Sequence, residues 1–291
     1  MSPPPSRWTD LDRPPLSAPA LRAALVGRGG PWTRIDITDV TGSTNADLAA
    51  AARTGAAAPG TVLVAEEQTS GRGRLGRSWS APPRSGLFFS VLLDPEADGV
   101  PAERLTWLPL LAGVATATAL ARAAGVDTAL KWPNDLLVRV PGPDGAGGQD
   151  AERKLGGILA ERADGGVVLG IGLNVSLRAD ELPVPTAGSL LLAGAAGTDR
   201  DPLLRAVLRS LGQWYGQWAE AGGDPAAGSL QSAYAAGCAT LGRRVRAELP
   251  GGGELRGEAV AVDGDGRLVI ATGPGARQAV AAADIVHLRA T

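Results

Sequence analysis

One seven-residue stretch of the sequence, from Gly71 to Arg77, combines residue types that suit the binding of an anion. It reads Gly-Arg-Gly-Arg-Leu-Gly-Arg, with three glycines and three arginines. Glycine lets a ligand approach the main chain closely, and the guanidinium group carries a fixed charge whose donors match carboxylate and phosphate oxygens. We therefore expect this glycine–arginine loop, residues 71–77, to wrap a carboxylate or a phosphate in a β-rich site.

The loop also fits the Gly-x-Gly-x-x-Gly pattern of dinucleotide-binding folds, in which a helix begins directly after the last glycine. The residues that follow here read Ser-Trp-Ser-Ala-Pro-Pro, and consecutive prolines leave no room for that helix. A nicotinamide-binding oxidoreductase is therefore rejected. A solvated arginine-rich hairpin is the plainer alternative, but Gln68, Ser70 and Trp79 crowd the same segment and favour a binding site.

Lysine is rare in this chain and occurs in two motif-like segments. Of the 28 basic residues only Lys131 and Lys154 are lysine. Lys131 begins Lys-Trp-Pro-Asn-Asp, although asparagine and aspartate after a proline are also ordinary turn formers. Lys154 stands at the entrance of a predicted strand whose glycines permit close approach of the backbone. A compact, rotatable ammonium group at both places indicates a chemical role.

A third polar cluster, Ser43-Thr44-Asn45, precedes a helix predicted over residues 46–54. We expect Thr44, with Asp47 three residues later, to cap this helix. Capping does not require Asn45 as well. The cluster therefore also suits a small polar group, such as a urea, held at the positive end of the helix.

Composition restricts the class of protein. A chain of 291 residues with 44% apolar residues can bury a real core in about two domains. The formal net charge of −2 gives no electrostatic case for a nucleic-acid binder. The single cysteine, Cys238, excludes an internal disulfide, and no histidine–cysteine cluster suits a metal. The first residues lack the apolar core of a signal peptide, so a cytoplasmic protein is expected.

The predicted elements alternate between strands and helices in an α+β pattern. Residues 1–33 are rich in proline and alanine, and predict an extended arm with one short helix near 16–26. The apolar run 105–121 predicts a buried helix rather than a membrane span, and the glycine-rich residues 141–148 predict a mobile insertion. From Cys238 onward, short strands between glycine turns predict a small five-strand barrel, in which His287 has a structural role. Strands are predicted at 34–40, 61–67, 86–93, 128–138, 153–161 and 167–175, and helices at 46–54, 105–124 and 203–220.

In these segments the chain resembles the biotin protein ligases. The four segments 42–45, 71–79, 131–135 and 154–159 carry the resemblance, which extends from about Arg34 to the C-terminus. It implies a mixed-sheet catalytic domain at 34–236, with flanking helices and the class II synthetase-like fold of biotin and lipoate ligases. An SH3-like β-barrel is implied at 237–291. The 33 residues before the first strand are too few for the DNA-binding domain of regulatory members, which implies no DNA partner.

The resemblance implies an enzyme that uses ATP and Mg²⁺ to convert biotin to biotinoyl-5′-AMP. Biotin is then transferred to a lysine of the biotin carboxyl carrier domains of acyl-CoA carboxylases. A monomer or weak dimer without membrane contact is expected. A lipoate protein ligase, and a non-enzymatic binding protein with an SH3-like module, stay open as alternatives.

The resemblance also implies roles for individual residues. Lys154 and Arg72 are the implied catalytic residues. The implied biotin contacts are Ser43, Thr44, Asn45, Gln68, Gly71, Arg72, Gly73, Arg74, Lys154 and Gly157. The implied ATP and adenylate contacts are Arg72, Arg74, Trp79, Lys131, Asn134, Asp135, Lys154 and Asn174. Magnesium would come with the ATP phosphates, and Asp135 is the candidate protein ligand.

Overall fold

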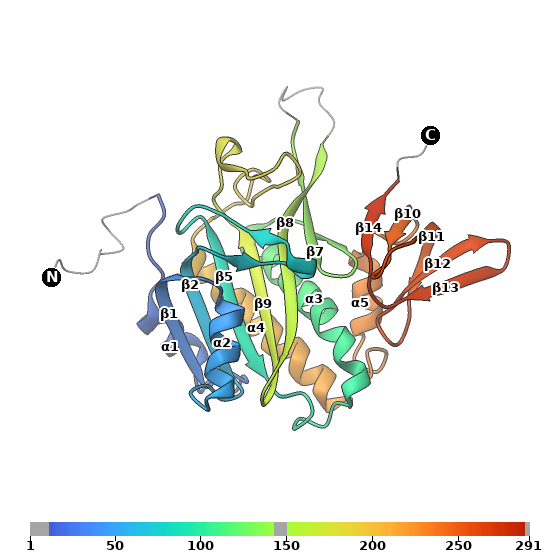
Figure 1. Ribbon diagram of the computed structural model, residues 1–291. Helices are drawn as coiled ribbons and strands as arrows, with labels where there is room; N and C mark the ends of the chain where they lie inside the picture. Colours follow the sequence, from blue (N-terminus) through green and yellow to red (C-terminus); the bar gives the residue numbers. More distant parts are fainter. Residues whose placement is uncertain (1–11, 143–149, 289–291) are drawn as a thin grey trace.

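A computed structural model describes residues 12–142 and 150–288 of the chain. Its central element is a seven-stranded mixed sheet in the order β1-β2-β5-β9-β8-β7-β6 (Figure 1). Only β1 and β2 pair in parallel, because a helix connects them, and every other neighbouring pair in this sheet is antiparallel. In chain order the strands are β1 Arg34–Thr41, β2 Thr61–Gln68, β5 Gly86–Leu93, β6 Ala129–Lys131, β7 Asp135–Val140, β8 Ala151–Ala163 and β9 Gly166–Asn174. The predicted α+β class and the strand positions are confirmed.

Helices cover the two faces of this sheet unequally. One face carries α2, Thr44–Arg53, whose Leu48 packs against Leu92 and Val168. The opposite face carries α1 Ala18–Leu25, α3 Leu108–Ala124 and α4 Arg200–Glu220, with α5 Leu230–Gly237 beside α3 (Figure 1). The larger hydrophobic core lies on that second face, so the α2 face has room for a binding site.

The apolar run near residue 105 forms a short 3₁₀ turn, Ala102–Trp107, followed by α3. Within residues 12–142 and 150–288, Ala102–Ala124 is the one helix long and apolar enough to cross a membrane, and 67% of its apolar window is buried inside the fold. It is the buried core helix that the sequence predicts.

The segment before β1 contains the predicted short helix, but it is not an extended arm. In α1 Leu21 and Leu25 are 0% and 3% exposed, and Trp32, at 2%, donates from Nε1 to the Leu208 carbonyl oxygen at 2.9 Å. The main-chain N–H of Leu16 donates to Glu66 Oε1 at 2.6 Å. These apolar side chains bury themselves between β1 and α4, which stabilises the segment as part of the core. Residues 1–11 of the predicted arm lie outside the described residues.

The C-terminal residues form a second, five-stranded antiparallel sheet in the order β13-β12-β11-β10-β14. Its strands are β10 Arg244–Glu248, β11 Glu254–Val262, β12 Leu268–Gly273, β13 Ala276–Val280 and β14 Asp284–His287. The predicted boundary after residue 236 falls in the last turn of α5. The predicted mobile insertion falls largely on residues 143–149, outside the described residues.

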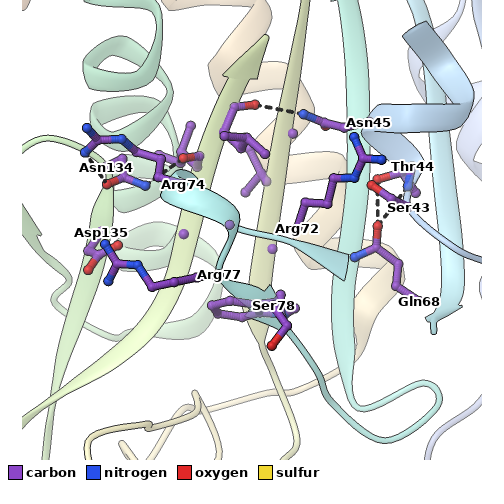
Figure 2. Close-up of a pocket in the computed structure, with 18 of the residues that line it drawn as sticks. Ser43, Thr44, Asn45, Gln68, Arg72, Arg74, Arg77, Ser78, Asn134 and Asp135 are labelled. Carbon is purple, nitrogen blue, oxygen red and sulfur yellow. Dashed lines mark hydrogen bonds between the residues drawn. The ribbon is translucent and has the colours of Figure 1, made fainter. Parts of the chain in front are cut away.

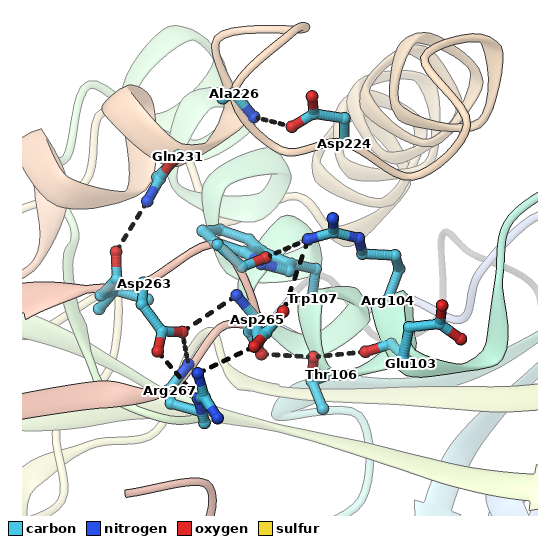
Figure 3. A network of polar contacts seen from close by, with 12 residues as sticks. Glu103, Arg104, Thr106, Trp107, Asp224, Ala226, Gln231, Asp263, Asp265 and Arg267 are labelled. Atoms are coloured by element: carbon cyan, nitrogen blue, oxygen red, sulfur yellow. Dashed lines mark hydrogen bonds and ion pairs between the residues drawn. The ribbon is translucent and has the colours of Figure 1, made fainter. Parts of the chain in front are cut away.

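A turn between β11 and β12 docks this second sheet on the first half of the chain (Figure 3). Trp107 Nε1 donates to the Gly264 carbonyl at 2.9 Å, and Trp132 Nε1 donates to the Gly266 carbonyl at 3.0 Å. Thr106 Oγ1 donates to the carbonyl oxygen of Asp265 at 2.7 Å. Because the two tryptophan donors are buried in the core, their hydrogen bonds hold the two sheets in a fixed orientation.

Candidate functional site

The glycine–arginine loop folds as a small hairpin across the α2 face of the central sheet (Figure 1). It consists of β3 Gly71–Arg72, a 3₁₀ turn at Arg74–Gly76 and β4 Ser78–Trp79. No helix follows the glycines, as the sequence predicts. A Cβ atom on Gly71 would lie 2.6 Å from the Trp79 carbonyl oxygen, so this position requires glycine. Leu75 adopts φ +56° at the tip of the turn.

A cavity lies between this hairpin, α2 and the sheet. Three glycines, Gly157 on β8 with Gly170 and Gly172 on β9, form part of its floor. A Cβ on Gly170 would lie 2.0 Å from Asn45 Oδ1, and one on Gly172 would lie 3.3 Å from the Trp79 ring. The other lining residues are Ser43, Thr44, Asn45, Gln68, Arg72, Gly73, Arg74, Arg77, Ser78, Trp79, Phe89, Asn134, Asp135, Lys154, Ile158, Leu159 and Ile171. Side chains in place of the floor glycines would fill the cavity.

Sequence reasoning identified Gly157 but not Gly170 and Gly172. Their signal is the Leu-Gly-Ile-Gly-Leu run of β9, in which glycine recurs at every second residue. Alternate residues of a strand share one face. The pattern therefore predicts a strand with one bare face.

One end of the cavity, which we call the amide end, is formed by Ser43, Thr44, Asn45 and Gln68 (Figure 2). The N-cap of α2 is Ser43, whose Oγ accepts from the Ala46 N–H at 3.5 Å, so the predicted capping by Thr44 is wrong. Thr44 instead turns toward Gln68: its main-chain N–H and its Oγ1 lie 2.8 and 3.1 Å from Gln68 Oε1. Since Gln68 Oε1 is used in this way, its Nε2 group is left to donate elsewhere.

The Asn45 side chain ties the start of α2 to the sheet. Its Nδ2 donates to the Leu159 carbonyl oxygen at 3.1 Å and to Glu161 Oε2 at 2.8 Å. Both amide protons are therefore bonded within the protein. The Asn45 amide therefore has two roles. It lines the cavity, and it fixes the position of the neighbouring Ser43 and Thr44.

The opposite end, which we call the cationic end, presents Arg74 and Lys154, together with Asn134 and Asp135, and Arg72 reaches into the cavity from the hairpin between the two ends. Arg74 Nη1 donates to Asn134 Oδ1 at 3.3 Å (Figure 2). Burial lowers the pKa of Arg74, and the charge of Asp284 opposes this shift. In the described part of the chain the Arg72 guanidinium makes no hydrogen bond or ion pair, and it extends toward the amide end. An exposed guanidinium of this kind is available to an anion.

Lys154 is positioned by main-chain hydrogen bonds as well as by the ion pair of its side chain. Its Nζ lies 2.6 Å from Asp135 Oδ1 and 5.7 Å from the centroid of the Trp79 ring. The main-chain N–H of Lys154 donates to the Thr186 carbonyl at 2.7 Å, and the Gly188 N–H donates to the Lys154 carbonyl at 2.8 Å. Sequence reasoning missed this supporting segment, because nothing local to Thr186 and Gly188 predicts contact with Lys154.

Three of the predicted site residues do not line this cavity. Gly71 borders the outer side of the hairpin. Lys131 lies half-buried, and burial lowers its pKa while Asp135 opposes the shift. Asn174 is 3% exposed and donates from Nδ2 to the Gly188 carbonyl at 2.9 Å; its Oδ1 has no hydrogen-bond partner among the described residues. The other predicted residues are brought together around one cavity.

Comparison with known families first defines the class of protein. Residues 37–177, which carry the sheet and the cavity, match the Biotin/lipoate A/B protein ligase family. Residues 240–288, which form the second sheet, match the Biotin protein ligase C terminal domain.

Individual relatives identify the family more narrowly. The biotin–acetyl-CoA-carboxylase ligase of Mycobacterium tuberculosis is 44% identical over 97% of this chain and 100% of its own length. The bifunctional ligase/repressor BirA of Bacillus subtilis is 32% identical over 78% of this chain, which spans only 66% of that protein. A biotin protein ligase from Aquifex aeolicus, solved in complex with biotin and ATP, superposes with a TM-score of 0.70 at 27% identity, covering 89% of this chain and 100% of that one. The chain belongs to the biotin protein ligase family.

Proposed function

We propose that this protein is an ATP-dependent biotin protein ligase, which forms biotinoyl-5′-AMP and transfers biotin to a lysine of a biotin carboxyl carrier domain of an acyl-CoA carboxylase. The observation that carries the proposal is the division of one cavity into an amide end and a cationic end. Biotin has the matching division, with a neutral ureido ring at one end and a carboxylate at the other. Hydrogen bonds recognise the first, and fixed positive charge recognises the second.

At the amide end, hydrogen bonds within the protein determine which donors and acceptors remain for the ureido ring of biotin. Ser43 Oγ accepts from the helix, so its proton is free to donate to the ureido carbonyl oxygen. Gln68 Nε2 donates to the same oxygen, because Thr44 occupies Oε1. We propose these contacts, with Asn45 as the anchor of Ser43 and Thr44.

At the cationic end the first step joins two anions. A carboxylate oxygen of biotin attacks the α-phosphorus of ATP, the bond to the bridging oxygen breaks, and pyrophosphate leaves with the electron pair. Arg72, Arg74 and the Gly71–Gly73 backbone wrap the carboxylate and the α-phosphate, and Lys154 Nζ exchanges Asp135 for their oxygens. Preorganised cations of this kind lower the barrier by stabilising the charge of the transition state. Lys154 and Arg72 are the proposed catalytic residues.

In the second step the neutral amine of the acceptor lysine attacks the acyl carbon of the mixed anhydride. The bond from that carbon to the AMP oxygen breaks, AMP leaves with the electron pair, and the proton lost by the amine passes to water. We assign Trp79, whose Nε1 is buried without a partner among the described residues, to the adenylate. Asn134, Asp135, Lys131 and Asn174 are assigned to the nucleotide side, the last two from behind the cavity wall.

Magnesium fits this site as an ion carried by ATP. Within the described ranges no group of three or more histidine, cysteine, aspartate or glutamate side chains could hold a metal alone. Mg²⁺ on nucleotides typically takes one or two protein carboxylates and keeps its phosphate and water ligands. Asp135 is the carboxylate that would hold it, and the ion would neutralise phosphate charge.

A lipoate ligase is the nearest rival, and the amide end argues against it. The dithiolane ring of lipoate has neither a hydrogen-bond donor for Thr44 Oγ1 nor a strong acceptor for Gln68 Nε2, so both groups would lose their partners in water without replacement. A non-enzymatic binding protein does not need Lys154 beside Asp135 in the cavity. We further propose a cytoplasmic monomer or weak dimer that acts on a carrier protein and not on DNA or membranes.

ATP–pyrophosphate exchange with Mg²⁺ tests the proposal when run with biotin, with lipoate and with neither acid. Exchange that depends on biotin is expected. Exchange only with lipoate would show that the protein is a lipoate protein ligase. No exchange with either acid would overturn the adenylation mechanism. Transfer of biotin to a purified carrier domain, measured by the gain in its mass, tests the second step.

A further inference from the structure

Ser90 is a polar residue inside an otherwise apolar strand. It lies at the centre of β5, Gly-Leu-Phe-Phe-Ser-Val-Leu-Leu, in which every residue is buried, and it is itself 0% exposed. A hydroxyl group buried this deeply is costly unless it is hydrogen-bonded. Ser90 Oγ has two neighbours, Asn45 Oδ1 at 2.6 Å and Thr44 Oγ1 at 2.7 Å, and both belong to the amide end.

The direction of the first hydrogen bond follows from the Asn45 amide. Its nitrogen faces two acceptors, the Leu159 carbonyl and the Glu161 carboxylate, so the orientation of the amide is fixed. Asn45 Oδ1 must then accept, and the single proton of Ser90 is donated to it. Ser90 therefore meets Thr44 only as an acceptor.

The direction of the second hydrogen bond then determines what Thr44 offers to a ligand. The Thr44 hydroxyl has two acceptors within reach, Ser90 Oγ at 2.7 Å and Gln68 Oε1 at 3.1 Å. The shorter contact favours donation to Ser90, and in both arrangements the proton is used inside the protein. Thr44 Oγ1 consequently faces the cavity with a lone pair.

We propose that Ser90 is a positioning residue for the ureido ring, which orients Thr44 as the acceptor of a ureido N–H and holds Asn45 in register. This inference rests on the proposed function. It completes the complementarity of the amide end, where Gln68 and Ser43 donate to the ureido oxygen and Thr44 accepts from the ureido nitrogen. Ser90 does not line the cavity and acts through Thr44.

A buried hydroxyl elsewhere in the fold provides a matched control. Thr116 in α3 is also 0% exposed, but its Oγ1 has no hydrogen-bond partner in the described structure. It lies on the helix that covers the other face of the sheet. Thr116→Val therefore removes a buried hydroxyl without touching the amide end.

The test compares Ser90→Ala with Thr116→Val in biotin-dependent ATP–pyrophosphate exchange, together with calorimetric titration of biotin. For Ser90→Ala we expect the KM and Kd for biotin to rise about tenfold, the size of one net hydrogen bond. The KM for ATP and the kcat at saturating biotin should stay within about twofold of the wild type, because the cationic end is unchanged. Thr116→Val should bind biotin as the wild type does.

A double-mutant cycle separates positioning from general loosening of the fold. Because Ser90 acts through Thr44, Ser90→Ala should weaken biotin binding much less in a Thr44→Val background than alone. Fully additive losses would overturn the proposal, as would an unchanged KM for biotin or equal rises in the KM for biotin and ATP. If Ser90→Ala does not fold, Ser90→Cys, which keeps the volume and a weak donor, gives the same comparison with a smaller rise.

The outcomes distinguish this inference from the proposed function. If the wild-type protein shows no biotin-dependent ATP–pyrophosphate exchange, the proposed function itself is wrong. If the wild-type protein shows that exchange but Ser90→Ala binds biotin with unchanged affinity, only the proposed role of Ser90 is wrong.

Discussion

The two ends of the cavity are built in opposite ways. At the amide end Ser43, Thr44 and Asn45 are 3–5% exposed, and each is hydrogen-bonded within the protein, Ser43 to the first turn of α2 and the other two to strands of the sheet. At the cationic end the Lys154 side chain is 34% exposed and paired with Asp135. Arg72 lies exposed on the hairpin between the two ends. One end is complete before the ligand arrives, and the other must exchange partners when it does.

The physical reason is the different cost of burial. Neutral polar groups can be buried without a ligand, because they satisfy one another. Several cations cannot be buried together without anions, so they remain near water or beside a carboxylate. The comparison indicates that the rigid end selects biotin, whereas the cationic end supplies the chemistry.

The largest effect is expected at the cationic end. Lys154→Ala should lower the kcat of biotin-dependent exchange by about 100-fold or more, because a preorganised charge is lost where charge develops. Its melting temperature should change little, since the pair with Asp135 is partly exposed. Arg162→Ala, which removes an exposed ion pair with Glu96 from the same strand, should leave the rate unchanged. An unaltered turnover number in Lys154→Ala would remove this residue from the mechanism.

The next effect belongs to the amide end. Gln68→Leu should raise the KM for biotin by about 10- to 100-fold, because Thr44 loses its acceptor and the ureido oxygen loses a donor in a buried site. The KM for ATP should stay close to the wild-type value. Thr69→Val, which alters the exposed neighbour of Gln68, is the control in the same exchange assay. A rise in the KM for ATP as large as that for biotin would contradict the division of the cavity into two ends.

In the wild-type protein, salt should weaken ligand binding at the two ends of the cavity to different extents. Raising NaCl from about 0.05 to about 0.5 M should increase the KM for ATP several-fold, because the Debye length falls below the spacing of the cations. The Kd for biotin in calorimetry should rise less, since biotin brings a single carboxylate charge to the cations and its ureido contacts are neutral. Parallel changes for both ligands would show that the ends are not electrostatically distinct.

The smallest effect should appear behind the cationic end, at the only histidine of the chain. Burial and the charges of Lys131 and Arg243 lower the pKa of His287 to about 4 from its ordinary 6.5. The unfolded chain therefore binds more protons between these values, and the free energy of unfolding should fall as the pH drops from about 6.5 to about 4. His287→Asn should remove this part of the pH dependence in chemical denaturation.

The same histidine reports on the charge of its surroundings through a single imidazole resonance. Lys131→Gln should raise the pKa of His287 in an NMR titration, because one of the charges that lowers it is removed. Binding of ATP should shift it in the same direction. If the pKa of His287 in both experiments equals that of the unliganded wild-type protein, the electric field of the cationic end does not reach β14.

Sequence reasoning found the parts of the site whose chemistry is local. The glycine–arginine loop and the two lysines stand out by residue type alone, and the strands of the sheet follow from apolar runs between turn residues. The choice of Ser43 over Thr44 as the helix cap did not follow, because both residues have a suitable hydroxyl and Gln68 decides between them.

Contacts between distant segments could not be read from the sequence. The burial of Leu21 and Trp32 depends on α4, which comes far later in the chain. The pairing of Thr186 with Lys154 likewise joins segments with no shared pattern. Sequence reasoning did not single out Ser90, because its hydrogen bonds depend on the position of α2 against β5.

The ion pair between Arg77 of the hairpin and Asp284 of β14 joins two segments that are translated far apart in time. Every residue that lines the cavity has left the ribosome's catalytic centre by the time Gly172 is added, but Asp284 follows roughly a hundred residues later, about 5–20 s at ordinary elongation rates. For that interval the nascent chain contains the whole lining, while the hairpin lacks its last anchor. The residues that line the cavity are thus translated early, and the partner of Arg77 in the hairpin is translated last.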